Sequence, residues 1–295
     1  MAEIKQRIGF IGLGNMGQGF TRRLTDCGYQ VTAYDIDTDK VSVAAGYGVV
    51  PASSPADVAR NCDVVHVCVM SGDVLESVVF GPDGIASGGT SGQVLVDHST
   101  VPVEATKALA QRLAAEIGMA WVDAPVSGGP PAATGGTLSI MVGGGEAEIT
   151  QVSQILDDLG SWTHMGPVGA GQVTKMVNQV LVLNTVCVLA EALTLAEAGG
   201  LDAAKIPQAL GSGYAGSVLL ERLYPRMVAR DFRPAAHASI ALKDLNMIAD
   251  LAKDLNVPTP MSSQTEGLYQ ILTSKGHDQL DLISILKVID PKEHL

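Results

Sequence analysis

Basic side chains are scarce in this chain of 295 residues. Lysine and arginine together number 19 against 31 aspartates and glutamates, so the formal net charge is −12. Proteins that bind nucleic acids or anionic membranes meet the negative charge with clustered basic side chains. The shortage therefore argues against both kinds of partner.

Cysteine pairs are also missing. The four cysteines are scattered and form no CxxC motif, which is typical of small buried thiols in a reducing compartment. His66 lies in an apolar run with no Cys or His at the spacing of a metal ligand, which favours a packed core histidine. No signal-peptide or transit pattern precedes the first strand pattern. We expect a cytoplasmic protein without a bound metal.

Apolar residues, in contrast, are plentiful. They make up 46% of the chain and charged residues 17%, which is enough apolar material for a sizeable core and argues against disorder. We find no low-complexity segment and no repeat of 20–50 residues. The length predicts one large or two ordinary domains.

The first 35 residues combine strand, helix and turn signals. Ile4–Ile11 has the pattern of a strand, Gln18–Cys27 that of a helix, and Tyr29–Tyr34 that of a second strand, which ends at Asp35. The turn between the first strand and the helix is a G-x-G-x-x-G motif formed by Gly12, Leu13, Gly14, Asn15, Met16 and Gly17. This order of elements predicts a dinucleotide-binding fingerprint.

Each part of the fingerprint has a physical task. Gly12 permits the tight turn, Gly14 lets a pyrophosphate approach, and Gly17 lets the helix pack against the strand. N–H groups at the helix start bind phosphates. Asp35 accepts hydrogen bonds from ribose hydroxyls, unless it merely caps the next helix. An NADP site usually presents a cation where this chain has three acids, with Lys40 as the nearest cation. The fingerprint thus predicts NAD, with NADP disfavoured.

Strand patterns continue to the middle of the chain, with a helix pattern at Val103–Gly118. Four apolar runs are typical of a parallel sheet: Asp63–Met70, Gln93–Asp97, Trp121–Asp123 and Thr137–Val142. Thr100 follows the second run, at the edge where open α/β sheets bind ligands, or it caps the helix. Ser127, Gly128 and Gly129, in a Pro/Gly loop that continues to Gly136, offer N–H groups to an anion. Taken alone, an ordinary glycine turn explains them better.

The second half of the chain has helix signals instead. Gly169–Gly200 is a long helix pattern with glycines at both ends, and no charge occurs from Met176 to Ala190. That uncharged run is too short for a membrane span, so we expect a helix buried within a soluble protein. Amphipathic stretches follow at Asp202–Leu210, Ser217–Val228, Ile240–Leu255, Ser262–Thr273 and Leu280–Val288. The sequence predicts a Rossmann-type α/β domain over 1–166 and an all-α domain over 167–295, joined by a long interdomain helix.

Lys175 is a single cation near the start of this helix. Asn178 and Gln179 follow at i+3 and i+4 and share its face. A buried lysine is rare, and on spacing alone a side chain that reaches solvent is an equal alternative. Further along, Lys243 and Asp244 lie in an otherwise apolar helix pattern, where an exposed charged turn is the ordinary explanation.

Together these motifs resemble the β-hydroxyacid dehydrogenases, which include the 3-hydroxyisobutyrate dehydrogenases and the tartronate semialdehyde (2-hydroxy-3-oxopropionate) reductases. The resemblance spans nearly the whole chain. It rests on residues 10–17, 123–129, 136–144 and 169–179, and it ends with 243–245. Several separate motifs in the family order make it specific.

The resemblance implies a role for each matching residue. Lys175 matches the catalytic lysine, and Asn178 matches its polar partner. Ser127, Gly128 and Gly129 match the loop that holds the substrate carboxylate. Four further residues match positions near the nicotinamide and its ribose: Val69, Met70, Thr100 and Lys243.

Two departures bear on the substrate. Many hydroxyisobutyrate enzymes carry two asparagines after the lysine, whereas this chain has Asn178 and Gln179. That pair, with Tyr214–Ser217, looks more like the tartronate semialdehyde reductases, and we expect Gln179 to contact the substrate. Pro130–Pro131 is the second departure, and it leaves the choice of substrate open.

The resemblance implies hydride transfer between NAD(H) and a short 3-hydroxy acid or its semialdehyde. A 2-hydroxy-3-oxopropionate reductase is the first expectation, and a 3-hydroxyisobutyrate dehydrogenase or another small hydroxy-acid dehydrogenase is the alternative. Lys175 argues against a non-catalytic cofactor-binding module and against an imine reductase, because such relatives lack the lysine. The apolar helical half predicts a homodimer or homotetramer.

Overall fold

The computed structural model describes residues 5–294, and the chain divides after Lys175 into two compact units. We call residues up to Lys175 the sheet unit and residues from Met176 the helical unit. The boundary that the sequence places between 166 and 167 stays a prediction. Ile4, at which the first predicted strand begins, lies outside the described residues.

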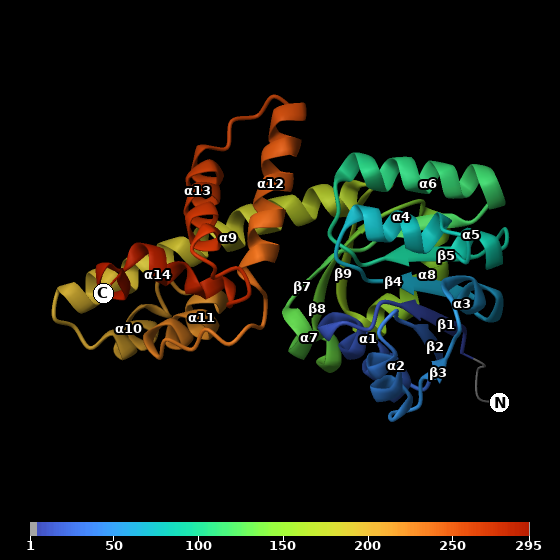
Figure 1. Cartoon of the computed structure of the whole chain (residues 1–295), viewed down its shortest axis with the longest axis horizontal. Coiled ribbons are helices and arrows are strands. Elements are labelled where there is room, and N and C mark those ends of the chain that lie inside the picture. Colours follow the sequence, from blue (N-terminus) through green and yellow to red (C-terminus); the bar gives the residue numbers. More distant parts are fainter. Residues whose placement is uncertain (1–4, 295) are drawn as a thin grey trace. The chain divides into compact units, whose positions relative to one another are not determined.

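The sheet unit contains one nine-stranded sheet (Figure 1). Its strands are β1 (Arg7–Ile11), β2 (Gln30–Tyr34), β3 (Val50–Pro51), β4 (Val64–Val67), β5 (Val94–Asp97), β6 (Ala120–Asp123), β7 (Val126–Ser127), β8 (Leu138–Gly143) and β9 (Gly160–Gly166). The order β3-β2-β1-β4-β5-β6 is parallel throughout, and β8 joins β6 antiparallel and carries β7 and β9. This is the Rossmann strand order, with its switch point between β1 and β4. The predicted fold class is confirmed.

Helices cover both faces of this sheet. They are α1 (Asn15–Asp26), α2 (Thr38–Ala45), α3 (Pro55–Asn61), α4 (Gly72–Phe80), α5 (Ile85–Gly88), α6 (Val103–Ile117), α7 (Gly129–Gly135) and α8 (Glu146–Leu159). One core cluster unites Phe20 of α1 with Ile155 of α8, and another unites Leu75 of α4 with Leu113 of α6. Figure 1 shows α3 to α6 together on one side of the sheet and α1 and α7 on the other.

The predicted loop from Pro130 to Gly136 is wrong, because most of it is helix α7. Pro130 and Pro131 occupy the first turn of that helix, where the missing proline N–H breaks no hydrogen bond. Gly136 ends it in a left-handed conformation, at φ 66°. The prolines therefore start a helix here rather than prevent one.

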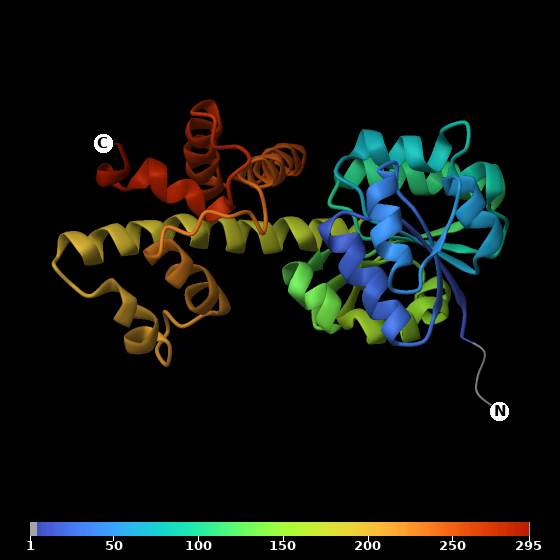
Figure 2. The same cartoon turned by 60° about the horizontal axis from the view of Figure 1, so that its bottom comes forward.

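The helical unit begins inside α9 (Ala170–Ala198), the predicted long helix. The remaining helices are α10 (Ile206–Leu210), α11 (Val218–Val228), α12 (Ala238–Asp254), α13 (Pro260–Ser274) and α14 (Leu286–Ile289), with short 3₁₀ turns at Ala203–Lys205, Leu282–Ile285 and Pro291–His294. Within this unit, α12 and α13 lie on one side of α9 and α11 on the other (Figures 1 and 2). Their shared core contains the buried rings of Tyr224 and Tyr269.

The expected burial of α9 is wrong for one of its faces. Leu183, Val186 and Leu193 lie in the helical core, but the opposite face exposes more than half of four apolar side chains: Val177, Leu181, Val188 and Leu195. An 18-residue window of α9 has a mean hydropathy of 1.8 and is 39% buried, so by length and composition alone the helix could cross a membrane. One such helix is weak evidence, because core helices of soluble proteins have the same composition.

Arg230 lies at the centre of a cluster of ion pairs in the helical unit. Its guanidinium donates to both carboxylate oxygens of Glu197 at 2.8 and 2.9 Å, to Asp290 at 2.9 Å and to Glu293 at 3.1 Å. Asp290 is fully buried. These bonds join the end of α9 to the C-terminal segment, and the bond from Arg230 lowers the pKa of Glu197.

Candidate active site

The glycine-rich turn lies at the carboxyl end of β1, where the sequence predicts it. Gly12 has φ 94°, and a Cβ there would lie 2.2 Å from the carbonyl oxygen of Cys68; a Cβ on Gly17 would lie 1.9 Å from the carbonyl oxygen of Gly12. In contrast, a Cβ on Gly14 would meet no atom within 4 Å. Two glycines thus allow close packing and the third leaves space, which fits a phosphate-binding turn at the start of α1.

Asp35 follows β2 and holds this turn. Its carboxylate accepts hydrogen bonds from the N–H groups of Leu13, at 2.6 Å, and Asp37, at 2.8 Å. The residue that caps α2 is Asp37, so the alternative in which Asp35 only caps that helix is wrong. Lys40 forms an ion pair with Asp37 at 3.3 Å, and Ile36 is 90% exposed. An apolar side chain thus stands where NADP sites usually carry a cation.

The turns after β4 and β5 lie beside the glycine turn at the switch point. The N–H of Val69 donates to the hydroxyl of Ser99 at 2.9 Å, which ties the two turns together. Met70 is exposed. Thr100 does not cap α6, since the N-cap residue there is Pro102. The predicted nicotinamide residues of the sheet unit are therefore neighbours along one edge of the sheet.

Two histidines are buried beneath this edge. Nδ1 of His98 donates to the carbonyl oxygen of Ala124 at 2.8 Å, so its Nε2 accepts from Nδ1 of His66 at 2.9 Å. The rings stack with Phe10 and Phe20. Burial lowers the pKa of His98 to about 4 and that of His66 well below 6.5, so both rings are neutral near pH 7. The prediction of a packed core histidine is confirmed.

The predicted substrate loop begins with β7 and continues into α7. Ser127 pairs with Ser139 of β8. Gly128 and Gly129 have φ 132° and 74°, and a Cβ on Gly128 would lie 2.6 Å from Cβ of Ala132. Both glycines adopt conformations that other residues rarely take, so a larger residue at either position would strain the turn.

Lys175 is buried, with 8% of its surface exposed. Its ammonium donates to the carbonyl oxygen of Val126 at 2.9 Å, so the lysine contacts the residue before Ser127. The alternative in which the side chain reaches solvent is wrong. A buried ammonium beside an anion-binding turn can bind a carbonyl oxygen and donate a proton to it.

In the helical unit, the other predicted polar residues form one chain of contacts. Lys243 pairs with Asp244 at 3.2 Å, and Asp244 accepts a 2.5 Å hydrogen bond from the amide nitrogen of Gln179. Gln179 in turn accepts from the amide nitrogen of Asn178 at 2.8 Å. Asp244 is buried, so the predicted exposed charged turn is wrong. A carboxylate can only accept, and it therefore fixes the orientation of both amides.

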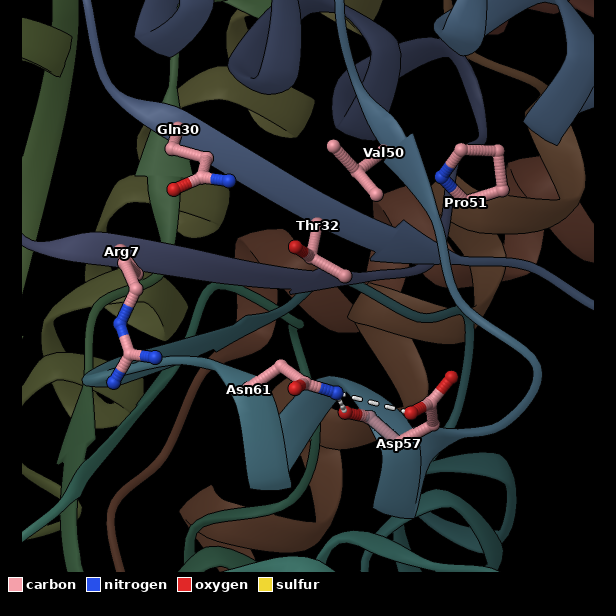
Figure 3. Close-up of a pocket in the computed structure, with 7 residues that line it drawn as sticks. All are labelled: Arg7, Gln30, Thr32, Val50, Pro51, Asp57 and Asn61. Atoms are coloured by element: carbon pink, nitrogen blue, oxygen red, sulfur yellow. Dashed lines mark hydrogen bonds between the residues drawn. The ribbon is translucent and has the colours of Figure 1, made fainter.

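A surface cavity of about 420 Å³ lies elsewhere in the sheet unit (Figure 3). Its walls include Arg7 and Gln30, the first residues of β1 and β2, with Asp57 and Asn61 of α3. These strands begin there and end at the glycine turn, so the cavity lies at the opposite edge of the sheet. Open α/β sheets bind their ligands at the carboxyl edge, and we do not assign the cofactor to this cavity. Over residues 5–294, no cluster of three or more His, Cys, Asp or Glu side chains could hold a metal ion.

Two family models together match nearly the full length of the chain. The model for the NAD-binding domain of 6-phosphogluconate dehydrogenase matches residues 7–177, and the model for the NAD-binding region of NADP-dependent 3-hydroxyisobutyrate dehydrogenase matches residues 169–289. The chain belongs to the β-hydroxyacid dehydrogenases. It is an NAD(P)-dependent oxidoreductase of hydroxy acids, and its family binds NAD or NADP.

Individual members of the family resemble the chain along its whole length. The 2-hydroxy-3-oxopropionate reductase of Escherichia coli is 33% identical over 96% of this chain and 97% of its own. The L-threonate dehydrogenase of Cupriavidus necator is 31% identical over 97% and 96%. The solved 3-hydroxyisobutyrate dehydrogenase of Mycobacterium tuberculosis with L-serine superposes with a TM-score of 0.86, at 26% identity over 96% of this chain and 99% of its own.

The sequence reasoning missed two buried residues that hold this dehydrogenase site together. Asp123 was given as the end of a strand and the first residue of a family motif, and Gln172 as part of another motif, and neither was given a role. Both are fully buried, and both contact residues 46 or more positions away. A polar residue at the end of an apolar strand was the available signal, but its partners are set by the tertiary fold.

Proposed function

We propose that this dehydrogenase interconverts 2-hydroxy-3-oxopropionate and the corresponding 2,3-dihydroxy acid with NAD(H). The observation that carries the chemistry is the buried ammonium of Lys175 on the carbonyl oxygen of Val126, beside Ser127. The Asn178–Gln179 pair and the similarity to the reductase of Escherichia coli support this substrate over other short hydroxy acids.

The dinucleotide accepts or supplies the hydride. The Gly12–Gly17 turn and the first N–H groups of α1 bind its phosphates, and Asp35 accepts from its ribose. Val69, Met70, Thr100 and Lys243 would line the nicotinamide and its ribose. Val69, Met70 and Thr100 follow strands at the carboxyl edge of the sheet, so they would hold this end of the cofactor there.

The substrate carboxylate binds to the hydroxyl of Ser127 and the N–H groups of Gly128 and Gly129. This anchoring decides which carbon of a short acid faces the nicotinamide. In the reduction, Lys175 stabilises the developing alkoxide and donates its proton to that oxygen. Asn178 and Gln179, on the same face of α9, meet the polar groups of the substrate.

Asp35 and Ile36 make NAD(H) the preferred cofactor in this proposal. A 2′-phosphate would meet the acids that follow β2, where Lys40 is already paired with Asp37. We expect kcat/KM with NADH to exceed that with NADPH by at least tenfold, equivalent to about 1.4 kcal/mol. Asp35→Ala combined with Ile36→Arg should narrow or reverse the preference. Equal rates with NADPH in the unchanged protein contradict the cofactor assignment but not the hydroxy-acid activity.

The substrate is tested by following NADH absorbance with a set of short semialdehydes. We expect 2-hydroxy-3-oxopropionate to give the highest kcat/KM. The main alternative is methylmalonate semialdehyde, the oxidised form of 3-hydroxyisobutyrate, since a solved 3-hydroxyisobutyrate dehydrogenase superposes over 96% of this chain. A higher kcat/KM with that aldehyde would replace the first assignment.

We also propose that the chain is a homodimer or homotetramer in a reducing cytoplasm. The apolar stripe of α9 formed by Val177, Leu181, Val188 and Leu195 supports the assembly, because exposed apolar patches mark interaction sites. Light scattering coupled to size-exclusion chromatography should give a multiple of 30.6 kDa. Leu181→Glu should lower that mass, whereas Leu201→Glu, beyond the helix, should not. A monomeric unchanged protein rejects the assembly.

A further inference from the structure

Asp123 binds the start of α9 with its side chain. Its two carboxylate oxygens accept hydrogen bonds from the N–H of Gly169 at 2.7 Å and from the N–H of Gln172 at 2.9 Å. The first N–H groups of a helix have no partner within the helix. A fully buried carboxylate at the end of β6 therefore caps α9 from 46 residues earlier in the chain.

Two glycines allow the chain to approach Asp123 this closely, because any other residue at either position would clash with it. A Cβ on Gly143 would lie 2.5 Å from one carboxylate oxygen, and a Cβ on Gly171 would lie 2.8 Å from the other and 2.6 Å from the carbonyl oxygen of Asp123. Burial raises the pKa of Asp123, and the N–H groups of Gly169 and Gln172 oppose that rise. The strand end and the helix start are thus in direct contact.

Gln172 extends this contact to the turns at the switch point. Its side-chain nitrogen donates to the carbonyl oxygen of Ser99 at 2.8 Å, and its side-chain oxygen accepts from the N–H of Val101 at 3.4 Å. Ser99 holds Val69 through its hydroxyl. The first turn of α9 is therefore bound to the residues on both sides of Thr100.

Lys175 completes a closed ring of contacts. It lies three residues after Gln172, and its ammonium donates to Val126, which lies three residues after Asp123. The ring runs along the main chain from Asp123 to Val126 and crosses to Lys175 through the hydrogen bond. It then follows the first turn of α9 back to Gln172 and closes at the carboxylate of Asp123. A shift at the cap must therefore move the ammonium relative to the Ser127 turn.

We propose that Asp123 is a positioning residue of the dehydrogenase, which sets the alignment of Lys175 with the Ser127–Gly129 turn and, through Gln172, with the turns that line the nicotinamide. The proposal rests on the role of Lys175 given above. It adds that the strand end, and not only the helix, fixes where the proton donor stands. It does not depend on which short hydroxy acid is the substrate.

The test compares Asp123→Asn with Asp97→Asn. The two aspartates are paired in register on neighbouring strands and are both fully buried, but Asp97 accepts from Ser99 and not from α9. The amide of Asp123→Asn keeps one acceptor and turns its nitrogen toward a donor. We expect kcat to fall 10- to 100-fold in Asp123→Asn, with the Kd for NADH within twofold, and to change less than threefold in Asp97→Asn. Rates are measured per folded molecule with the best hydroxy acid or semialdehyde available.

A double-mutant cycle separates positioning from mere stability. If Asp123 acts through Lys175, Asp123→Asn should reduce the residual rate of Lys175→Ala by less than threefold. Hydrogen exchange should accelerate at residues 169–175 in Asp123→Asn, but not at residues 183–193. A full effect in the Lys175→Ala background, or unchanged exchange at 169–175, overturns the proposal.

Gln172→Met provides a second route if Asp123→Asn does not fold. It keeps the volume and the backbone N–H on Asp123 but removes the bonds to Ser99 and Val101. We expect a smaller loss of kcat, about 3- to 10-fold, which again should disappear in the Lys175→Ala background. A loss that persists there assigns Gln172 a purely structural role and contradicts the ring of contacts. If no hydroxy acid at all is turned over, the proposed function is wrong. The hydrogen-exchange measurement then still tests whether Asp123 caps the start of α9.

Discussion

In the helical unit, the buried carboxylates of Asp281 and Asp290 face arginines, at 3.3 and 2.9 Å. These two carboxylates also accept from backbone N–H groups, whereas the buried carboxylate of Asp123 in the sheet unit accepts from the N–H groups of Gly169 and Gln172 and has no ion pair among the described residues. Within residues 5–294, neither arginine bonds to a predicted site residue, and their partners include Asp281, Asp290 and nearby backbone carbonyls. Their pairs should therefore matter mainly for stability. The carboxylate of Asp123 orients a strand end and a helix start, and in this protein those two ends carry the proposed chemistry.

Lys175→Ala should show the largest effect on rate. We expect kcat to fall by about 10²–10⁴, because the variant loses a proton donor and an electrostatic stabiliser of the alkoxide. NADH binding and the melting temperature should stay close to those of the unchanged protein. Steady-state kinetics measures kcat, fluorescence titration measures NADH binding, and a thermal melt gives the melting temperature. Retained turnover would mean that the proton comes from another group. It would also contradict the placing of the chemistry in the sheet unit.

Arg230→Ala should show the opposite pattern. Its loss leaves Asp290 buried without its partner, which costs about 3–5 kcal/mol of folding free energy. The melting temperature should fall clearly, while kcat per folded molecule should stay unchanged. Arg233→Ala is the matched control, because Arg233 is 88% exposed in its pair with Asp231 and such exposed pairs contribute little to stability. A fall in kcat with normal stability would contradict the division between the two units.

Gly128→Val should act on substrate binding. The residue has φ 132° and would place Cβ against Ala132, so the N–H groups of the turn must shift. We expect KM for carboxylate substrates to rise about tenfold or more, equivalent to about 1.4 kcal/mol, with the Kd for NADH little changed. Gly135→Ala, at the other end of α7, is the control, because its Cβ would lie 3.7 Å from the nearest atom. An unchanged KM would mean that Ser127–Gly129 is an ordinary turn that does not bind the substrate carboxylate.

The smallest expected effect is a pH dependence of stability from His66 and His98. Their pKa values are lowered in the folded state, to about 4 for His98, so the unfolded chain binds more protons between about pH 4 and 6.5. Stability from this pair is present above pH 6.5 and is lost as the pH falls. The stability difference between the unchanged protein and His66→Phe should therefore shrink between pH 7 and 5. A constant difference in denaturant titrations would mean that folding does not lower the pKa of His66.

The contrast between the units also explains what the sequence could predict. Gly12, Gly14, Gly17 and Asp35 serve a local geometry of strand, turn and helix, so their order along the chain identified them. Residues at the ends of parallel strands, such as Thr100, share one edge by topology, and their place also followed from the pattern.

The remaining features depend on contacts that no local pattern reports. The partners of Asp123 are 46 and 49 residues away, and Arg230 joins residues 33 to 63 positions apart. The short strands β3 and β7 have two residues each, too few for a periodicity. The exposed stripe of α9 was missed because an apolar helix has the same composition whether its partner is its own chain or another.

The central claim is that hydride passes between the nicotinamide and the aldehyde carbon of a short hydroxy acid at the edge of the sheet. NADH that carries deuterium in the transferred position tests this directly, with 2-hydroxy-3-oxopropionate as acceptor and mass spectrometry of the product. We predict glycerate with one deuterium on C3, and almost none formed by Lys175→Ala in the same time. Unlabelled glycerate, or labelled product at an equal rate from Lys175→Ala, would contradict the account.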